Sequence, residues 1–160
     1  MDEQAEPELG RIRCHRQVLL AQSEYFKGFL QFNDIAQHNN DNDDGNNEAE
    51  DEPTILTVRE HSLQDVQAMV DFIYLGKARV NSNDLVDLLS LCQEYLLVGM
   101  KQAIEHVFAS QLTLDLFLDI YMLTRAFDCR QLKESCVSFA VANYQGLRQK
   151  GLLAQLDRDD

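Results

Sequence analysis

The sequence predicts an α+β fold that is mostly helical and includes a small sheet. Apolar residues recur at intervals of three and four in several segments between Val18 and Ala140, which is the pattern of amphipathic helices. Three short segments, residues 11–14, 54–58 and 78–80, are predicted to be strands instead. With 160 residues, of which 45% are hydrophobic and 26% charged, the chain is long enough to bury one sizeable core.

The first helices are predicted to form a hairpin around Ser23. The apolar residues on its two sides recur at helical spacing and are Val18, Leu19, Leu20, Tyr25, Phe26, Phe29 and Leu30. A serine in this place can accept hydrogen bonds from backbone N–H groups at the start of the second helix. We therefore expect two short helices with Ser23 as the cap between them.

A polar tract, residues 33–53, interrupts the apolar pattern. It contains eight Asp and Glu residues and no Lys or Arg, and such a segment cannot bury a core. We predict a disordered insertion that folding does not require, because each doubling of a surface loop costs only about 0.6 kcal/mol. Residues 40–51 match a calcium-binding loop poorly, since Asn40 stands in place of the first aspartate and Asp51 in place of the bidentate glutamate.

Further helices are predicted after the tract. Ser62, with Asp65 three places on, resembles a capping box, and Gly76 suits a left-handed stop. Asn81 and Asp84 suggest another helix start. The stripes expected to bury a core are Leu63, Val66, Met69, Val70 and Ile73; Leu85, Leu88, Leu89, Cys92, Tyr95 and Leu96; Met100, Ile104, Val107 and Phe108; Phe117, Ile120, Tyr121 and Phe127; and Leu132, Cys136, Phe139 and Ala140.

The charge of the chain limits its partners. A formal net charge of -13 repels phosphate backbones and anionic lipids, so we expect neither nucleic-acid nor membrane binding. No run of about 20 apolar residues is present. Residues 1–8 contain four acids and no basic or apolar stretch of a signal peptide, which predicts an intracellular protein of the cytoplasm, the nucleus or both.

The reactive residue types do not form a catalytic or metal-binding pattern. Four histidines lie far apart, and four cysteines include no closely spaced pair, so we expect free thiols, mostly buried, and no metal or cofactor. His15 is predicted to be a hydrogen-bonded structural histidine and not a base. Because no nucleophile motif or phosphate-binding loop is present, the sequence does not indicate an enzyme.

Four blocks, in order, resemble the signature of BTB, or POZ, domains. They are Cys14-His15-Arg16-Gln17-Val18-Leu19, Ser23-Glu24-Tyr25-Phe26, Phe72-Ile73-Tyr74-Leu75-Gly76, and Leu88-Leu89 with Glu94-Tyr95-Leu96. The resemblance covers residues 10–109, with 33–53 as an insertion, and residues 110–156 resemble the first helices of a BACK-type extension. It implies an α-rich domain with a small sheet, used for self-association and for recruiting protein partners.

The chain departs from the family in two places. Family members usually begin with a strand that carries an aspartate and exchanges between dimer partners, whereas residues 1–9 have no hydrophobic strand. Arg16 matches a basic position that pairs with this aspartate in some members, so the charged pocket is expected to be half present. The acidic insertion is the second departure. We therefore expect a monomer or a weak homodimer, also because the charge of -13 repels a second copy.

The resemblance also implies candidate partner-binding residues. In cullin-binding members, a hydrophobic residue and an acid two places later, just after the second helix, contact the cullin, and Phe32-Asn33-Asp34 is similar, with Asp for the usual Glu. Phe32 could equally close the apolar face begun by Phe29. Tyr95 matches a tyrosine near that surface, or its ring packs on its own helix.

Two functions follow from the resemblance. The first is an adaptor that links a cullin-RING ubiquitin ligase scaffold to substrates. The alternative is a self-associating scaffold domain of a transcriptional or cytoskeletal regulator without ligase contact. Binding to a purified cullin N-terminal domain distinguishes them.

Overall fold

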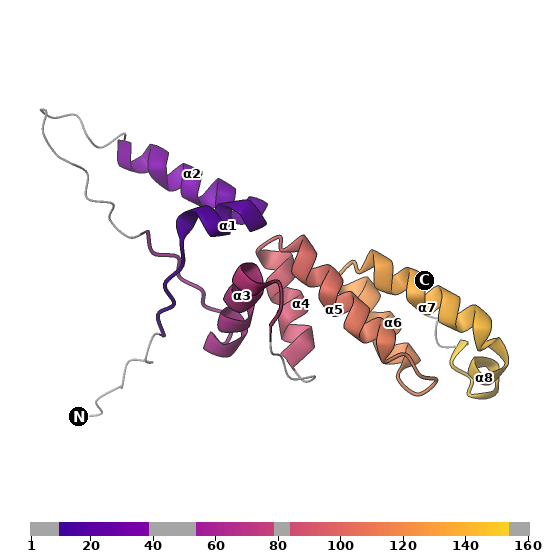
Figure 1. Ribbon diagram of the computed structural model, residues 1–160. Coiled ribbons are helices and arrows are strands. Elements are labelled where there is room, and N and C mark those ends of the chain that lie inside the picture. Colours follow the sequence, from indigo (N-terminus) through magenta and orange to yellow (C-terminus); the bar gives the residue numbers. More distant parts are fainter. Residues whose placement is uncertain (1–9, 39–53, 79–83, 154–160) are drawn as a thin grey trace, which may run out of the picture. The chain divides into compact units, whose positions relative to one another are not determined.

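The computed structural model describes residues 10–38, 54–78 and 84–153 (Figure 1). The chain divides into two compact units, Met1–Leu96 and Leu97–Asp160. The predicted domain boundary after residue 109 lies within the second unit and stays a prediction. Within the described ranges, no helix has the length and apolarity needed to cross a bilayer.

The first unit contains helices α1 (Arg16–Gln22), α2 (Glu24–His38), α3 (Leu63–Leu75) and α4 (Leu85–Glu94). Helix α1 packs against α2 and α3, and α3 packs against α4. The predicted hairpin around Ser23 is confirmed, because α1 ends and α2 begins at this residue. Leu88, Leu89 and Leu91 of α4 are fully buried and form the centre of the core of this unit.

Both ends of α3 follow the signals in the sequence. The hydroxyl of Ser62 accepts a hydrogen bond from the Asp65 backbone N–H at 3.1 Å and donates one to the Asp65 carboxylate at 2.6 Å. Gly76 ends the helix in the left-handed conformation, with φ 67°, and its N–H donates to the Phe72 carbonyl at 2.8 Å. A side chain at Gly76 would cost about 1–2 kcal/mol in this conformation, which explains why glycine stands here.

The second unit contains α5 (Val98–Ser110), α6 (Phe117–Ala126), α7 (Arg130–Ala142) and α8 (Tyr144–Gln149). Helix α7 packs against each of the other three (Figure 1). The sequence analysis missed α8, because its one apolar core residue, Leu147, makes no periodic stripe. Leu147 is nevertheless fully buried and anchors this short helix.

The predicted core stripes are largely buried. Ile73 and Leu89, the central residues of two stripes, are both buried, as are the thiols of Cys92, Cys129 and Cys136, which are free. Leu63, at the start of α3, and Val107, on α5, are exceptions with exposed fractions of 55% and 38%, and a third exception is Leu96 with 51%. It lies beyond the end of α4 with φ 51°, so its side chain leaves the helical stripe.

The mostly helical prediction is confirmed, but residues 10–38, 54–78 and 84–153 contain no strand. Residues 11–14 and 54–58, predicted as strands, are irregular. Strand composition produces a strand only where a neighbouring segment supplies ladder hydrogen bonds, and neither segment has such a neighbour within the described ranges. Of the third predicted strand, residues 78–80, only Ala78 is described.

The polar tract and the second helix overlap. Helix α2 continues to His38, so residues 33–38, predicted to belong to the disordered insertion, are helical. Extending a helix that has already formed costs little, which explains how a polar segment can continue it. Residues 39–53 lie outside the described ranges, as does Asn81 of the predicted cap. Asp84 does precede α4, but its side chain makes no capping hydrogen bond.

Candidate functional site

Helix α2 presents a row of aromatic rings, Tyr25, Phe29 and Phe32, which we call the α2 aromatic face. The rings of Tyr25 and Phe29 are stacked, with centroids 6.3 Å apart. Phe32, one turn further on, is 72% exposed. Phe26 and Leu30, on the neighbouring side of α2, are buried, whereas Tyr25 and Phe29 are half-buried, so the aromatic face runs from the edge of the core at Tyr25 to solvent at Phe32.

The start of α2 is fixed by Ser23. The buried hydroxyl of Ser23 accepts a hydrogen bond from the Phe26 backbone N–H at 3.3 Å and donates one to the Tyr95 carbonyl at 2.5 Å. A single side chain therefore caps α2 and ties it to the end of α4, 72 residues away in sequence.

Tyr95 lies beneath the α2 aromatic face. Its ring centroid is 4.9 Å from that of Tyr25, edge to face, and 5.7 Å from that of Phe26, stacked. Burial, followed by the neighbouring Glu94 carboxylate, raises the pKa of the Tyr95 phenol far above its usual range. Since only 2% of Tyr95 is exposed, the residue supports the aromatic face from below, and its direct contact with a partner stays a prediction.

A second contact with the end of α4 involves His61, to which the sequence analysis gave no specific role. The largely buried imidazole places Nε2 2.8 Å from the Glu94 carboxylate, and the ring lies edge-on to Tyr95. The two partners are 33 residues apart in the chain, so no local pattern indicated the pair. His61 thereby holds the segment before α3 against the end of α4.

The two residues of the family motif at the start of α1 bind other helices. The His15 backbone N–H donates to the Tyr74 hydroxyl at 2.6 Å, and its Nδ1 lies 2.8 Å from the same oxygen. The Arg16 guanidinium donates to the Leu30 carbonyl of α2 at 3.3 Å. His15 therefore links α1 to α3, and Arg16 links α1 to α2.

The remaining predicted contact residue, Asp34, lies in α2 two positions after Phe32. The structure describes its backbone and not its side chain. The motif was expected just after the second helix, whereas α2 continues through it. Phe32 and Asp34 are thus brought onto one helix, whereas Tyr95 lies apart from them beneath the start of that helix.

Neither of two hollows on the surface of the described residues contains a catalytic arrangement. The larger, of about 590 Å³, lies between α5 and α7 and includes Ser135 and Ser138. These hydroxyls donate to the backbone carbonyls of Gln131 and Glu134, so neither is hydrogen bonded to a general base. Among the described residues, no cluster of three His, Cys, Asp or Glu side chains could hold a metal ion.

Replacing Ser23 with alanine is expected to lower the free energy of unfolding by about 1–2 kcal/mol, since both the cap of α2 and the partner of the Tyr95 carbonyl are lost. Urea denaturation measures the change. Thr113→Ala is the matched control, because the exposed Thr113 hydroxyl only accepts from the nearby Leu116 N–H. An equal cost for both variants would contradict a role of the bond to Tyr95.

Comparison with known proteins gives one family. A family model described as BTB/POZ domain matches residues 8–112. The helices after residue 112 lie outside this match, so their assignment to a BACK-type extension stays a prediction.

Three similar proteins cover different shares of the chain. "ARM repeat protein interacting with ABF2" of Arabidopsis thaliana is 32% identical over 51% of this chain and 11% of its own length. "BTB and MATH domain-containing protein 40" of Caenorhabditis elegans is 24% identical over 84% of this chain and 31% of its own. "Kelch-like protein 7" of Rattus norvegicus is 24% identical over 92% of this chain and 23% of its own.

The chain therefore spans less than a third of the length of each of these relatives. Helices α1 to α5, the α2 aromatic face and the four motif blocks lie within residues 8–112, which make up more than half of the chain. The chain belongs to the BTB/POZ domain family, whose members are protein-interaction modules.

Proposed function

We propose that this chain is an adaptor module that binds a cullin-type ligase scaffold through Phe32 and Asp34 of α2. The observation that carries the proposal is the 72% exposure of Phe32. If Phe32 closed the apolar face begun by Phe29, its ring would be buried, so its exposure favours an intermolecular role. An aromatic ring of this kind gains most when a partner pocket removes it from water.

The surroundings of Phe32 support the same role. Helix α2 is capped by Ser23, tied to α4 through Tyr95 and tied to α1 through Arg16. These contacts hold the helix before a partner arrives, so little conformational entropy is lost on binding. Asp34, two positions on, would fix the orientation of the partner through charge-assisted hydrogen bonds.

Replacing Phe32 with alanine is expected to weaken binding to a cullin N-terminal domain by about 2 kcal/mol, or roughly thirtyfold. Isothermal titration calorimetry measures the affinity, and circular dichroism confirms that the variant folds. Asp34→Ala is expected to cost less, because a carboxylate at the rim of an interface is partly solvated.

Ile55→Ala is the matched control, since Ile55 of the same unit is also highly exposed and lies outside α2. If wild type does not bind at tens of micromolar, the ligase role is wrong. If wild type binds and Phe32→Ala binds equally well, the adaptor role stands but the assignment of Phe32 is wrong.

The alternative function, a self-associating scaffold, is favoured by a different surface. Leu63 of α3 is exposed beside a hollow of about 470 Å³, which it lines together with Gln64, Gln67, Ala68 and Asp71. A second copy could bury this side chain. Analytical ultracentrifugation at micromolar concentration tests it, and a tight dimer that Leu63→Ser dissociates would favour the scaffold role.

A further inference from the structure

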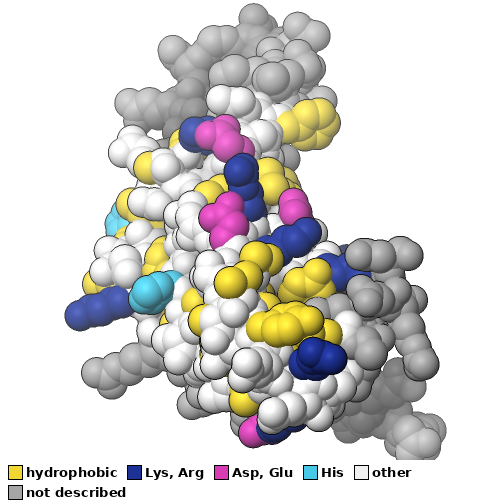
Figure 2. Space-filling model, turned by 90° about the vertical axis from the view of Figure 1, so that its right-hand side faces the viewer, with side chains coloured by type: hydrophobic (Ala, Val, Ile, Leu, Met, Phe, Trp, Pro, Cys, Tyr) yellow, Lys and Arg dark blue, Asp and Glu magenta, His cyan; other side chains and the backbone are white. Residues whose placement is uncertain are grey.

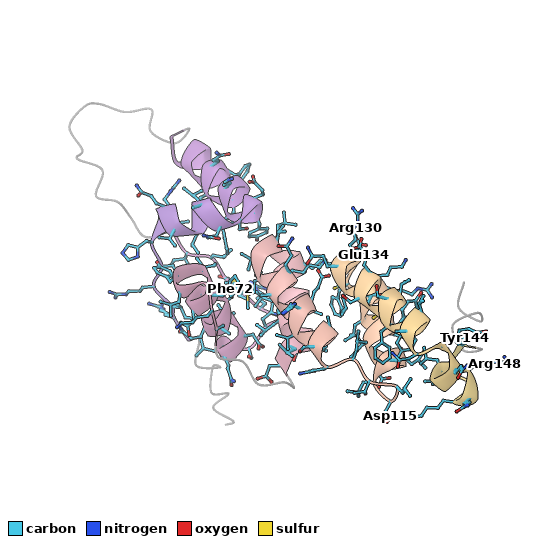
Figure 3. The ribbon with its side chains drawn as sticks, turned by 45° about the vertical axis from the view of Figure 1, so that its right-hand side comes forward. Phe72, Asp115, Arg130, Glu134, Tyr144 and Arg148 are labelled. Atoms are coloured by element: carbon cyan, nitrogen blue, oxygen red, sulfur yellow. The ribbon has the colours of Figure 1, made fainter. Side chains whose placement is uncertain are left out.

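The second unit exposes a row of apolar side chains that the proposed function does not use. Val137 and Val141 lie one turn apart on α7, and Tyr144 begins α8. Their exposed fractions are 52%, 75% and 54%. We call these three residues the α7–α8 strip. Figure 3 shows Tyr144 at one end of α7 and the labelled pair Arg130 and Glu134 at the other.

The strip does not contribute to the core of its own unit. Leu132 and Cys136, on the other side of α7, are fully buried and supply its core contacts. An exposed valine makes few packing contacts. It also disfavours the helical backbone, because its branched β-carbon restricts the side chain there. Two valines one turn apart on the solvent face are therefore unfavourable in the isolated unit, which points to burial by a partner.

The position of Tyr144 is fixed although its ring is exposed. Leu147 of the same helix is fully buried. The backbone at Gly146 packs so closely that an added β-carbon would lie 3.0 Å from the Leu114 side chain. Lys150, just after α8, forms an ion pair with Asp115. The ring is thus presented on a short helix that is anchored by Leu147 and by the close packing at Gly146, while the exposed ion pair adds little, and this anchoring lowers the cost of ordering the ring on binding.

Basic side chains border the strip. Figure 2 views the molecule from the side of α7 and α8 and shows apolar side chains with Lys and Arg, and also Asp and Glu, beside them. Lys133 and Arg148 form no ion pair with any residue that the structure describes. Arg130 lies 3.5 Å from Glu134, but this pair is strongly exposed and therefore weak. A local excess of positive charge in a chain of net charge -13 favours an acidic ligand at this place.

We propose that the α7–α8 strip binds an acidic amphipathic helix of a partner protein. Helix α7 extends for about 17 Å from Arg130 to Val141 at 1.5 Å per residue, which is the length of a helix of about 12 residues. Side chains one turn apart form a ridge that packs into a groove of a second helix. A second copy of this chain is disfavoured as the occupant, because two identical strips would oppose their basic borders.

The experiment uses the full 160-residue chain and three fluorescein-labelled synthetic helical peptides. The first is amphipathic, with leucines at helical spacing and glutamates on both flanks. The second has lysine in place of each glutamate, and the third is a scrambled form of the first. Fluorescence anisotropy is expected to show binding of the acidic peptide in the micromolar range and at least tenfold weaker binding of the other two.

Variants of the strip locate the binding. Val141→Ser and Lys133→Glu are each expected to weaken binding of the acidic peptide at least tenfold. Val107→Ser, at an exposed valine of α5 outside the strip, is the matched control and is expected to leave it unchanged. Charge reversal is preferred to added salt, because salt also screens the long-range repulsion of an acidic ligand by the chain.

Three outcomes would overturn the proposal. In the first, the acidic, basic and scrambled peptides bind equally. In the second, Val141→Ser binds the acidic peptide as tightly as Val107→Ser does. In the third, sedimentation reveals a dimer of the chain that Val141→Ser dissociates, which would make a second copy the occupant. None of these outcomes concerns Phe32, so the test is independent of cullin binding.

Discussion

Replacing Leu89 with alanine is expected to lower the free energy of unfolding by about 2–5 kcal/mol. Leu89 is fully buried in α4, next to Leu88, Leu91 and Cys92, which are also buried. The substitution removes apolar contacts and leaves a cavity that the tightly packed residues around it cannot fill by small shifts. Urea denaturation followed by circular dichroism measures the loss.

Val86→Ala on the same helix is the matched control for Leu89→Ala. Val86 is partly exposed, so its truncation creates no closed cavity and is expected to cost less than about 1 kcal/mol. A cost at Leu89 no larger than that at Val86 would contradict the packing of α4 described above.

Replacing Glu105 with alanine is expected to cost about 2–4 kcal/mol. This buried glutamate of α5 accepts a hydrogen bond from the Leu132 backbone N–H at 2.8 Å, near the start of α7. The residue that precedes α7, Cys129, makes no side-chain cap, so Glu105 takes that role from another helix. Thermal or urea unfolding measures the effect.

Glu105→Gln separates the hydrogen bond from the charge. Glutamine keeps an acceptor for the Leu132 N–H but loses the negative charge near the start of α7, so a loss of about 1 kcal/mol is expected. Equal losses for Glu105→Ala and Glu105→Gln would mean that the charge, and not the hydrogen bond, stabilises the turn before α7.

The turn before α7 also contacts a positively charged side chain. Lys101, one turn before Glu105 on α5, donates to the carbonyls of Phe127 and Asp128 at 2.6 and 3.2 Å. Cys129 lies between the contacts of Lys101 and that of Glu105. Burial, as the larger cause, and the Glu105 charge raise the pKa of its thiol to about 11. This thiol therefore stays protonated at neutral pH and is a poor nucleophile.

Local patterns predicted the helices well, because their signals lie within a few residues. Ser62 and Gly76 determine the ends of α3 through short-range hydrogen bonds and backbone geometry. Both residues can be recognised in the sequence as helix-end signals. The apolar stripe of α4 was predicted for the same reason. The prediction was wrong at Leu96, because the backbone leaves the helix there.

Contacts between distant segments were not predictable from one sequence. The pairs Ser23–Tyr95 and His61–Glu94 join residues that no spacing rule relates. The same limit applies to the strands, since β composition at residues 54–58 does not specify a pairing partner. For the candidate site, the motif indicated Phe32, whereas the exposure of its ring and the support from Tyr95 required the structure.

The separation between Ser23 and Tyr95 bears on when the candidate site forms during folding. Their hydrogen bond closes a loop of 72 residues, whereas Glu105 and Leu132 in the second unit are 27 residues apart. Contacts of high sequence separation form late, because the entropy of closing the loop is lost before they stabilise the chain. On a ribosome, Phe32 emerges long before Tyr95 is synthesised. The nascent chain thus cannot hold α2 in its final place, and partner binding is delayed until α4 has folded.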